Sequence, residues 1–356
     1  MEIWPGAADP AWEPLQDEMI ARGWGDGLPI VAPTADRVER MLAGRRPEAD
    51  RVLCELAPLF APVTWRDVAV NAVMAGCRPE YLPVVAAAVE ALAAPELNLV
   101  GIATTTGSAA TAVIVNGPIV RNIGMNAAAN ALGPGNRANA TIGRAVRLVL
   151  QNVGGARPGE IDMATLGQPA KYTFCFAENE SESPWLPLHV ERGFAPQDNV
   201  VTVVGTAGIV EIVDSSSSDC ADLAQTFAHS MRIAGTLGGG AMLGGGEPLL
   251  VMPPEQARML EQGGCSKAQF KERVWQKAVM PLADLSPAVR THLLGRLQGE
   301  PAPQRADAML RVAEKRDDIT IVVAGGVGIK AAYIPTWGGS TRAVSRLVPA
   351  LDRGQS

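Results

Sequence analysis

Three side chains suited to proton transfer lie within a short stretch of this chain: Glu178, Glu180 and His189. Carboxyl and imidazole groups serve as general acids and bases because burial and neighbouring charges can move their pKa toward neutral pH. His189 is one of only three histidines in the 356 residues, so its place beside two glutamates is informative. We therefore predict that these groups move protons in a catalytic site.

Cys77 is a further candidate for chemistry. It lies beside Arg78 at the junction of two predicted helices. A cysteine exposed at such a corner next to a cation has a lowered pKa and is nucleophilic. Cys77 is therefore a candidate nucleophile, and the competing interpretation is an inert core residue, since isolated cysteines are usually buried.

Residues 133–137 read Gly-Pro-Gly-Asn-Arg and precede an apolar pattern that predicts a helix over residues 137–153. Asn136 is a favourable N-cap. Backbone N–H groups at a helix start, beside glycines that permit close approach, suit a carboxylate or phosphate, and Arg137 adds a positive charge. The competing interpretation is an ordinary capped helix.

We expect this loop and the glutamate–histidine segment to share one pocket for a small polar or anionic molecule. The residues predicted to bind that substrate are Gly133, Gly135, Asn136, Arg137, Asn139, Lys171, Tyr172 and Trp185.

The same glutamates and histidine are also possible metal ligands. Only one histidine lies in this segment, however, and the chain has no HxxxH pair. The sequence therefore predicts neither a metal nor another cofactor, with a divalent-metal-dependent enzyme as the alternative. Residues 326–331 match G-x-G-x-x-A, but Pro335 follows too soon for the helix that a dinucleotide-binding fold requires.

Hydrophobic periodicity favours an α/β or α+β fold of two similarly built lobes, each a mixed sheet covered by helices. Residues 1–195 would form the N-terminal lobe with the site, and residues 196–356 the C-terminal lobe. Strand, proline turn and helix succeed one another at 28–44 and again at 247–264, which suggests a repeat. Further strands are predicted at 98–103, 112–116, 172–177 and 319–324, and residues 51–93 are expected to be helical.

The composition limits the classes of partner. A net charge of −6 argues against a nucleic-acid or anionic-membrane surface. No run of 18 apolar residues is present, and the first residues show no secretory signal pattern. Five scattered cysteines without a CxxC pair favour a reducing, cytoplasmic location without disulfides. Alanine- and glycine-rich segments at 122–132 and 235–246 suggest close contacts between copies, hence a homo-oligomer.

Several stretches together resemble a poorly characterised bacterial family associated with UGSC-motif selenoproteins and their cysteine versions. They are residues 26–31 (DGLPIV), 71–81 (NAVMAGCRPEY), 137–144 (RANATIGR), 171–180 (KYTFCFAENE), 183–185 (SPW) and 187–189 (PLH). The resemblance covers most of the chain, which itself has no UGSC tetrad; residues 263–266 (GGCS) come nearest. It implies a small thiol or selenol redox protein as partner.

Three functions follow as expectations. The preferred one is a cytoplasmic lyase or hydrolase that cleaves or eliminates from a small polar or anionic molecule without a cofactor. In it Glu178 or Glu180 moves protons, His189 assists, and Cys77 is a possible nucleophile. The others are a non-catalytic subunit that holds substrate for a thiol or selenol redox system, and a divalent-metal enzyme.

Overall fold

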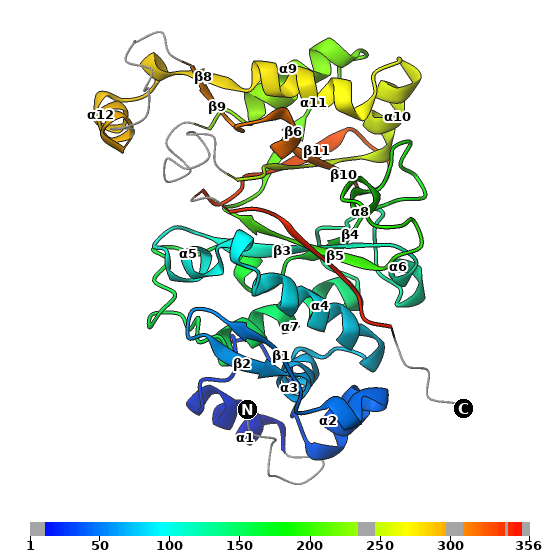
Figure 1. The fold of residues 1–356 in the computed structure, drawn as a ribbon, viewed down its shortest axis with the longest axis vertical. Coiled ribbons are helices and arrows are strands. Elements are labelled where there is room, and N and C mark those ends of the chain that lie inside the picture. The colour runs from blue at the N-terminus through cyan, green and yellow to red at the C-terminus, as the bar shows by residue number, and fades with distance from the viewer. Residues whose placement is uncertain (1–10, 234–245, 297–308, 339–340, 351–356) are drawn as a thin grey trace.

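The computed structural model describes residues 11–233, 246–296, 309–338 and 341–350. Within them, two four-stranded sheets pack face to face, and helices cover the outer face of each sheet (Figure 1). The predicted α/β class, with mixed sheets covered by helices, is confirmed.

Each sheet has the same pattern of strand directions. The first sheet has the order β12-β5-β3-β4 and the second β10-β7-β11-β6. Two strands at one edge of each sheet are parallel to each other: β3 and β4 in the first sheet, β7 and β10 in the second. The remaining neighbours in each sheet pair antiparallel. The bounds are β3 Ala110–Asn116, β4 Cys175–Ala177, β5 Val200–Thr206, β6 Val210–Val213, β7 Leu249–Met252, β10 Thr320–Val323, β11 Lys330–Ile334 and β12 Val344–Leu347.

The two lobes exchange one strand each. After β5, the chain crosses to the second sheet as β6, and after β11 it returns to the first sheet as β12. The two halves are therefore built alike, as predicted, but a single cut after residue 195 does not separate the two sheets. The segment at 28–32, expected to be a strand of the repeat, is not one; β3 is the counterpart of β7.

Alternation along the strands builds the core. In β3, Ala112 and Ile114 face the second sheet, whereas Val113 and Val115 face the helices of the first lobe. Since side chains on a strand alternate between its faces, an unbroken apolar strand serves two buried layers. β7 does the same for the second lobe.

The helices of the first lobe are α1 Trp12–Ala21, α2 Ala35–Leu42, α3 Trp65–Ala75, α4 Leu82–Leu92, α5 Leu99–Thr104, α6 Ile119–Asn122, α7 Arg137–Asn152 and α8 Leu188–Glu191; those of the second are α9 Cys220–Ser230, α10 Pro254–Gln262, α11 Lys267–Lys277 and α12 Pro287–Arg296. Two small antiparallel sheets complete the elements used below: β1 Val52–Leu56 pairs with β2 Ala61–Thr64, and β8 Val279–Pro281 pairs with β9 Met309–Arg311. The short 3-10 helices are η1 Ala43–Glu48, η2 Pro79–Tyr81, η3 Pro95–Leu97, η4 Pro169–Lys171, η6 Leu282–Asp284 and η7 Arg316–Asp318.

Two further predictions of local structure are wrong. The strand expected at 98–103 is replaced by α5 at 99–104, because the Asn98 side chain accepts from the backbone N–H of Gly101 and caps a helix. Residues 51–93 are not all helical, since the β1–β2 hairpin precedes α3. The strand predicted at 172–177 is limited to its last three residues.

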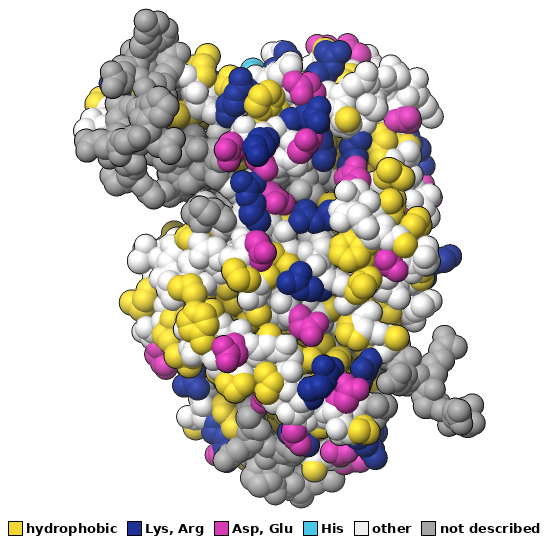
Figure 2. Space-filling model, in the orientation of Figure 1, with side chains coloured by type: hydrophobic (Ala, Val, Ile, Leu, Met, Phe, Trp, Pro, Cys, Tyr) yellow, Lys and Arg dark blue, Asp and Glu magenta, His cyan; other side chains and the backbone are white. Residues whose placement is uncertain are grey.

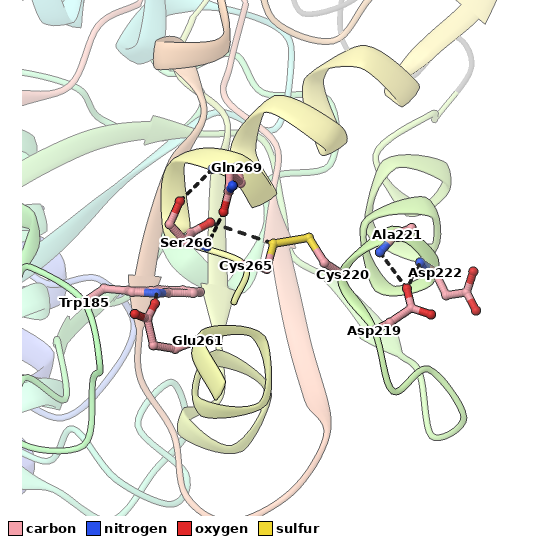
Figure 3. Close-up of a disulfide and its surroundings, with 9 residues drawn as sticks. All are labelled: Trp185, Asp219, Cys220, Ala221, Asp222, Glu261, Cys265, Ser266 and Gln269. Atoms are coloured by element: carbon pink, nitrogen blue, oxygen red, sulfur yellow. Dashed lines mark hydrogen bonds between the residues drawn. A yellow bond between two sulfur atoms is a disulfide. The ribbon is translucent and has the colours of Figure 1, made fainter. Parts of the chain in front are cut away.

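The described chain contains one disulfide, which joins Cys220 to Cys265 (Figure 3). It links the start of α9 to the turn between α10 and α11. The expectation that the cysteines form no disulfide is therefore wrong: the fold brings together two cysteines that are 45 residues apart in sequence. Cys54, Cys77 and Cys175 are free.

None of the described helices is long and apolar enough to cross a membrane. Basic side chains lie among acidic ones on the face drawn in Figure 2. Of the two segments that suggested oligomer contacts, 235–246 lies outside the described residues except for Gly246. The other, 122–132, runs from the last residue of α6 into a loop.

Candidate functional site

Four polar side chains gather where the parallel strands β3 and β4 end. Asn116 is the last residue of β3, and Glu178 follows β4 directly. Carboxyl ends of parallel strands meet at one edge of a sheet, which is where α/β proteins commonly bind ligands. Asn116 Nδ2 donates to Glu178 Oε2 at 2.7 Å and to Glu180 Oε1 at 2.9 Å, so one amide links both carboxyl groups.

Glu180 is the member of this group that reaches solvent, with 27% of its side chain exposed. Its Oε1 also accepts from the backbone N–H of Gly117 at 2.8 Å. Gly117 has φ +91, and a Cβ there would collide with the carbonyl oxygen of Asp198. A glycine is therefore required to bring this N–H to the carboxylate.

His189 lies behind Glu180 and is fully buried. It belongs to α8, whose first residue, Leu188, donates its backbone N–H to Glu178 Oε2 at 2.8 Å. The Nδ1 atom of His189 lies 3.7 Å from Glu180 Oε1. Neither ring nitrogen has a hydrogen-bond partner among the described residues.

Burial raises the pKa of the Glu178 carboxyl, which is 2% exposed. The nearby Lys267 ammonium and the hydrogen bonds from Leu188 and Asn116 oppose this rise, and the charge of Glu180 adds to it. Glu178 Oε1 and Asn116 Oδ1 are buried without a partner among the described atoms. Buried polar atoms without partners cost free energy, so their retention is a pointer to function.

This arrangement can support proton transfer at the solvent-accessible Glu180 carboxylate, with the His189 ring close behind it. The buried Glu178 carboxyl shares the Asn116 amide with Glu180 and so helps to fix its position. The competing interpretation is that the cluster only stabilises the fold: Asn116 and Leu188 both donate to Glu178 and so connect β3, the end of β4 and α8. That interpretation explains Glu178 Oε2 but leaves His189 without a role.

No group of three or more histidine, cysteine, aspartate or glutamate side chains is arranged to hold a metal ion in the part of the chain that the structure describes. The metal alternative for Glu178, Glu180 and His189 therefore gains no support from their geometry.

Arg137 and Cys77 lie together, apart from the glutamates. Both line a pocket of about 220 Å³ beside the end of α3. Arg137 Nε donates to the carbonyl oxygen of Gly76, so its guanidinium is directed at α3. The residues that line this pocket do not include Glu178, Glu180 or His189, and the expected shared pocket is not supported.

Cys77 is 7% exposed, and burial raises the pKa of its thiol to about 12. The Thr141 carbonyl and the charges of Arg137 and Arg144 oppose the rise but do not cancel it. The prediction of an exposed cysteine with a lowered pKa is wrong, because the corner after α3 packs onto α7.

The loop before α7 is held by asparagine side chains. Asn136 caps α7 as predicted, with its side chain accepting from the N–H of Asn139. Asn139 is 4% exposed and bonds the backbone of Asn126 and Ala131. Its polar atoms are used within the loop, so the structure assigns it a structural role in place of the predicted substrate contact.

Gly133 and Gly135 belong to the same loop. A Cβ at Gly133 would collide with the Asn130 side chain, and Gly135 has φ +113. Both glycines are thus explained by the path of the loop, without a ligand.

Lys171 and Tyr172 line a different pocket, of about 570 Å³, at the start of β4. They precede the strand, whereas Glu178 and Glu180 follow it. Trp185 is 9% exposed and donates from Nε1 to Glu261 Oε2 at 2.8 Å, which ties its loop to α10 (Figure 3). Trp185 therefore acts in packing the lobes.

Sequence reasoning missed Asn116, although a polar residue that ends an apolar strand is a recognisable signal. It also missed Asp162, which lies in an irregular loop where no pattern marks it. In comparisons with known proteins, no protein-family model, curated protein or solved structure matches this chain.

Proposed function

We propose that the protein is an enzyme that transfers protons on a small polar molecule at the cluster of Asn116, Glu178, Glu180 and His189. The observation that carries the proposal is the convergence of these side chains at the ends of β3 and β4, with buried polar atoms that no described residue satisfies. Such a cluster suits cleavage or elimination, in which one group removes a proton and another supplies one.

The accessible Glu180 would remove a proton from substrate. The N–H groups of Asn116 and Gly117 stabilise its negative charge and hold its orientation. His189 would take up or return that proton by closing the 3.7 Å gap to Glu180. Glu178 accepts hydrogen bonds from the Asn116 side chain and the Leu188 backbone. It would thereby hold the Asn116 amide where that amide also reaches Glu180.

The test is a search for turnover in a metabolite extract, analysed by mass spectrometry before and after incubation with purified protein. Wild type should deplete specific metabolites that Glu180→Gln leaves untouched. Glu182→Gln is the matched control, because Glu182 lies in the same loop but is about half exposed and pairs with Arg258 on the surface. Equal depletion by wild type and Glu180→Gln, or no depletion by either, refutes the proposal.

A second candidate is a subunit that holds a molecule for a thiol or selenol redox partner. It is favoured by the separation of the larger pocket, with Lys171 and Tyr172, from the glutamate–histidine cluster. Co-purification with a small thiol protein, together with no turnover in isolation, would support this candidate over the first.

We also propose a cytoplasmic homo-oligomer. The three free cysteines support a reducing location, whereas the Cys220–Cys265 disulfide counts against it. Trapping thiols in intact cells with an alkylating agent decides the redox state, and light scattering decides the number of subunits.

A further inference from the structure

A pocket lined by two of the predicted binding residues, Lys171 and Tyr172, lies between α7 and the loop that leads to β4. It has a volume of about 570 Å³, and its polar lining includes Arg147, Gln151, Asp162 and Lys171. It lies at the opposite end of β4 from Glu178 and Glu180. Its chemistry is therefore separate from the proton-transfer cluster.

Arg147 is the unusual member of this lining. It extends from the middle of α7 and is only 8% exposed. Its Nε donates to the carbonyl oxygen of Lys171 at 3.0 Å, and its Nη2 lies 3.7 Å from Asp162 Oδ2, beyond hydrogen-bond range. Since a guanidinium carries five N–H donors, Arg147 retains donors that no described residue uses.

Arg147 shares its nearest carboxylate with Lys171: both oxygens of Asp162 contact Lys171 Nζ at 2.6 Å, whereas only Oδ2 lies near Arg147, at 3.7 Å from Nη2. The other carboxylate of the lining, Asp26, is held by both Nε and Nη2 of Arg144 at 2.7 and 2.8 Å. Arg144 lies outside the lining but neutralises Asp26, so within the lining Arg147 and Lys171 share the single carboxylate of Asp162. A buried guanidinium that shares its counter-ion and leaves N–H donors unused is stabilised when an anion binds to those donors.

The opening of the pocket is apolar. Leu166 is 92% exposed and Tyr172 is 48% exposed, and both belong to the lining. An apolar rim over a polar base fits a molecule with one charged end and an apolar body.

We propose that this pocket binds an organic monocarboxylate, with the carboxylate on Arg147 and the apolar body against Leu166 and Tyr172. The planar guanidinium fork matches a carboxylate in two parallel hydrogen bonds. A single excess charge suits one carboxylate better than a phosphate dianion.

Isothermal titration calorimetry with benzoate, phenylacetate and hexanoate tests the site, with the corresponding neutral amides and inorganic phosphate as comparisons. At least one carboxylate should bind at least ten-fold more tightly than its amide and than phosphate. Arg147→Gln should abolish that binding. Arg157→Gln, which replaces an arginine of the same loop outside the lining, should leave it unchanged.

Because Arg147 is buried, its replacement can disturb folding, so Tyr172→Ala supplies a second variant at a half-exposed position. It should weaken carboxylate binding several-fold while the circular dichroism spectrum stays that of wild type. No binding by any of the three carboxylates overturns the proposal. Equal binding of acids and amides, or unchanged binding in folded Arg147→Gln and Tyr172→Ala, overturns it as well.

Discussion

Nδ1 of His189 lies 3.7 Å from Oε1 of Glu180, at the boundary between a fully buried ring and a partly exposed carboxylate. A closer approach of about 1 Å would create a charge-assisted hydrogen bond. The two side chains come from different elements, α8 and the segment after β4, so their separation depends on how these elements pack. This pair is the centre of the proposed chemistry.

If Glu180 and His189 act as one unit, their substitutions should not be additive. Each of Glu180→Gln and His189→Gln should lower kcat about 10²- to 10⁴-fold, and the double variant should be no worse than the poorer single variant. A double-mutant cycle on turnover, with rates corrected for the folded fraction, measures the coupling. Losses that multiply would show that the two residues act independently.

Glu178 should give the protein a distinctive dependence of stability on pH. Its pKa in the folded state is raised above the usual 4.5 by burial. Its contribution to stability is therefore fully present below that value and is lost as pH rises through the folded pKa. Each unit of separation is worth about 1.4 kcal/mol.

The variant Glu178→Gln should remove this part of the pH dependence. In urea unfolding between pH 4.5 and 8, the free energy of unfolding of wild type should fall relative to that of Glu178→Gln as pH rises. Glu182→Gln provides the baseline for an exposed glutamate. Parallel pH profiles for wild type and Glu178→Gln would contradict the assignment of a raised pKa.

Cys77 should be chemically inert in the folded protein. With its thiol pKa raised from 9.0 to about 12 by burial, the thiolate fraction falls about a thousand-fold relative to an ordinary cysteine. Cys77→Ser should retain turnover. Alkylation by iodoacetamide at pH 8, followed by mass spectrometry, should label Cys77 in urea but scarcely in buffer; equal rates in both would refute this prediction.

The Cys220–Cys265 bond should stabilise the second lobe. By closing a loop of 45 residues, it lowers the entropy of the unfolded chain by an amount worth about 4 kcal/mol. A Cys220→Ser/Cys265→Ser variant should therefore unfold at lower urea concentration. Adding reductant should shift wild type toward the double variant while leaving the variant itself unchanged, and a shift in both would point to another cause.

Local signals in the sequence predicted much of the framework. The capping residues Thr64 and Ser266 mark the starts of α3 and α11, each with a capping box. The apolar runs that became β3 and β10 were found, because fully buried strands are unbroken apolar stretches. By contrast, Asn98 turned an apolar run into α5, since a cap can outweigh strand propensity.

The candidate site was predicted only in part. Glu178, Glu180 and His189 come together as expected, since they belong to one short segment. Arg137 does not join them, because its direction is decided by how α7 packs on α3. The contact of Arg137 with Gly76, like that of Arg147 with Asp162, depends on how separate elements pack. The spacing of residues along the sequence does not reveal such packing.

The ratio of kcat/KM between wild type and Glu180→Gln, on a metabolite that the wild-type protein depletes, tests the central claim most directly. Proton transfer by Glu180 predicts a ratio of at least about 100, with Glu182→Gln within about two-fold of wild type. A ratio near one, in a Glu180→Gln protein shown to be folded, would contradict the account.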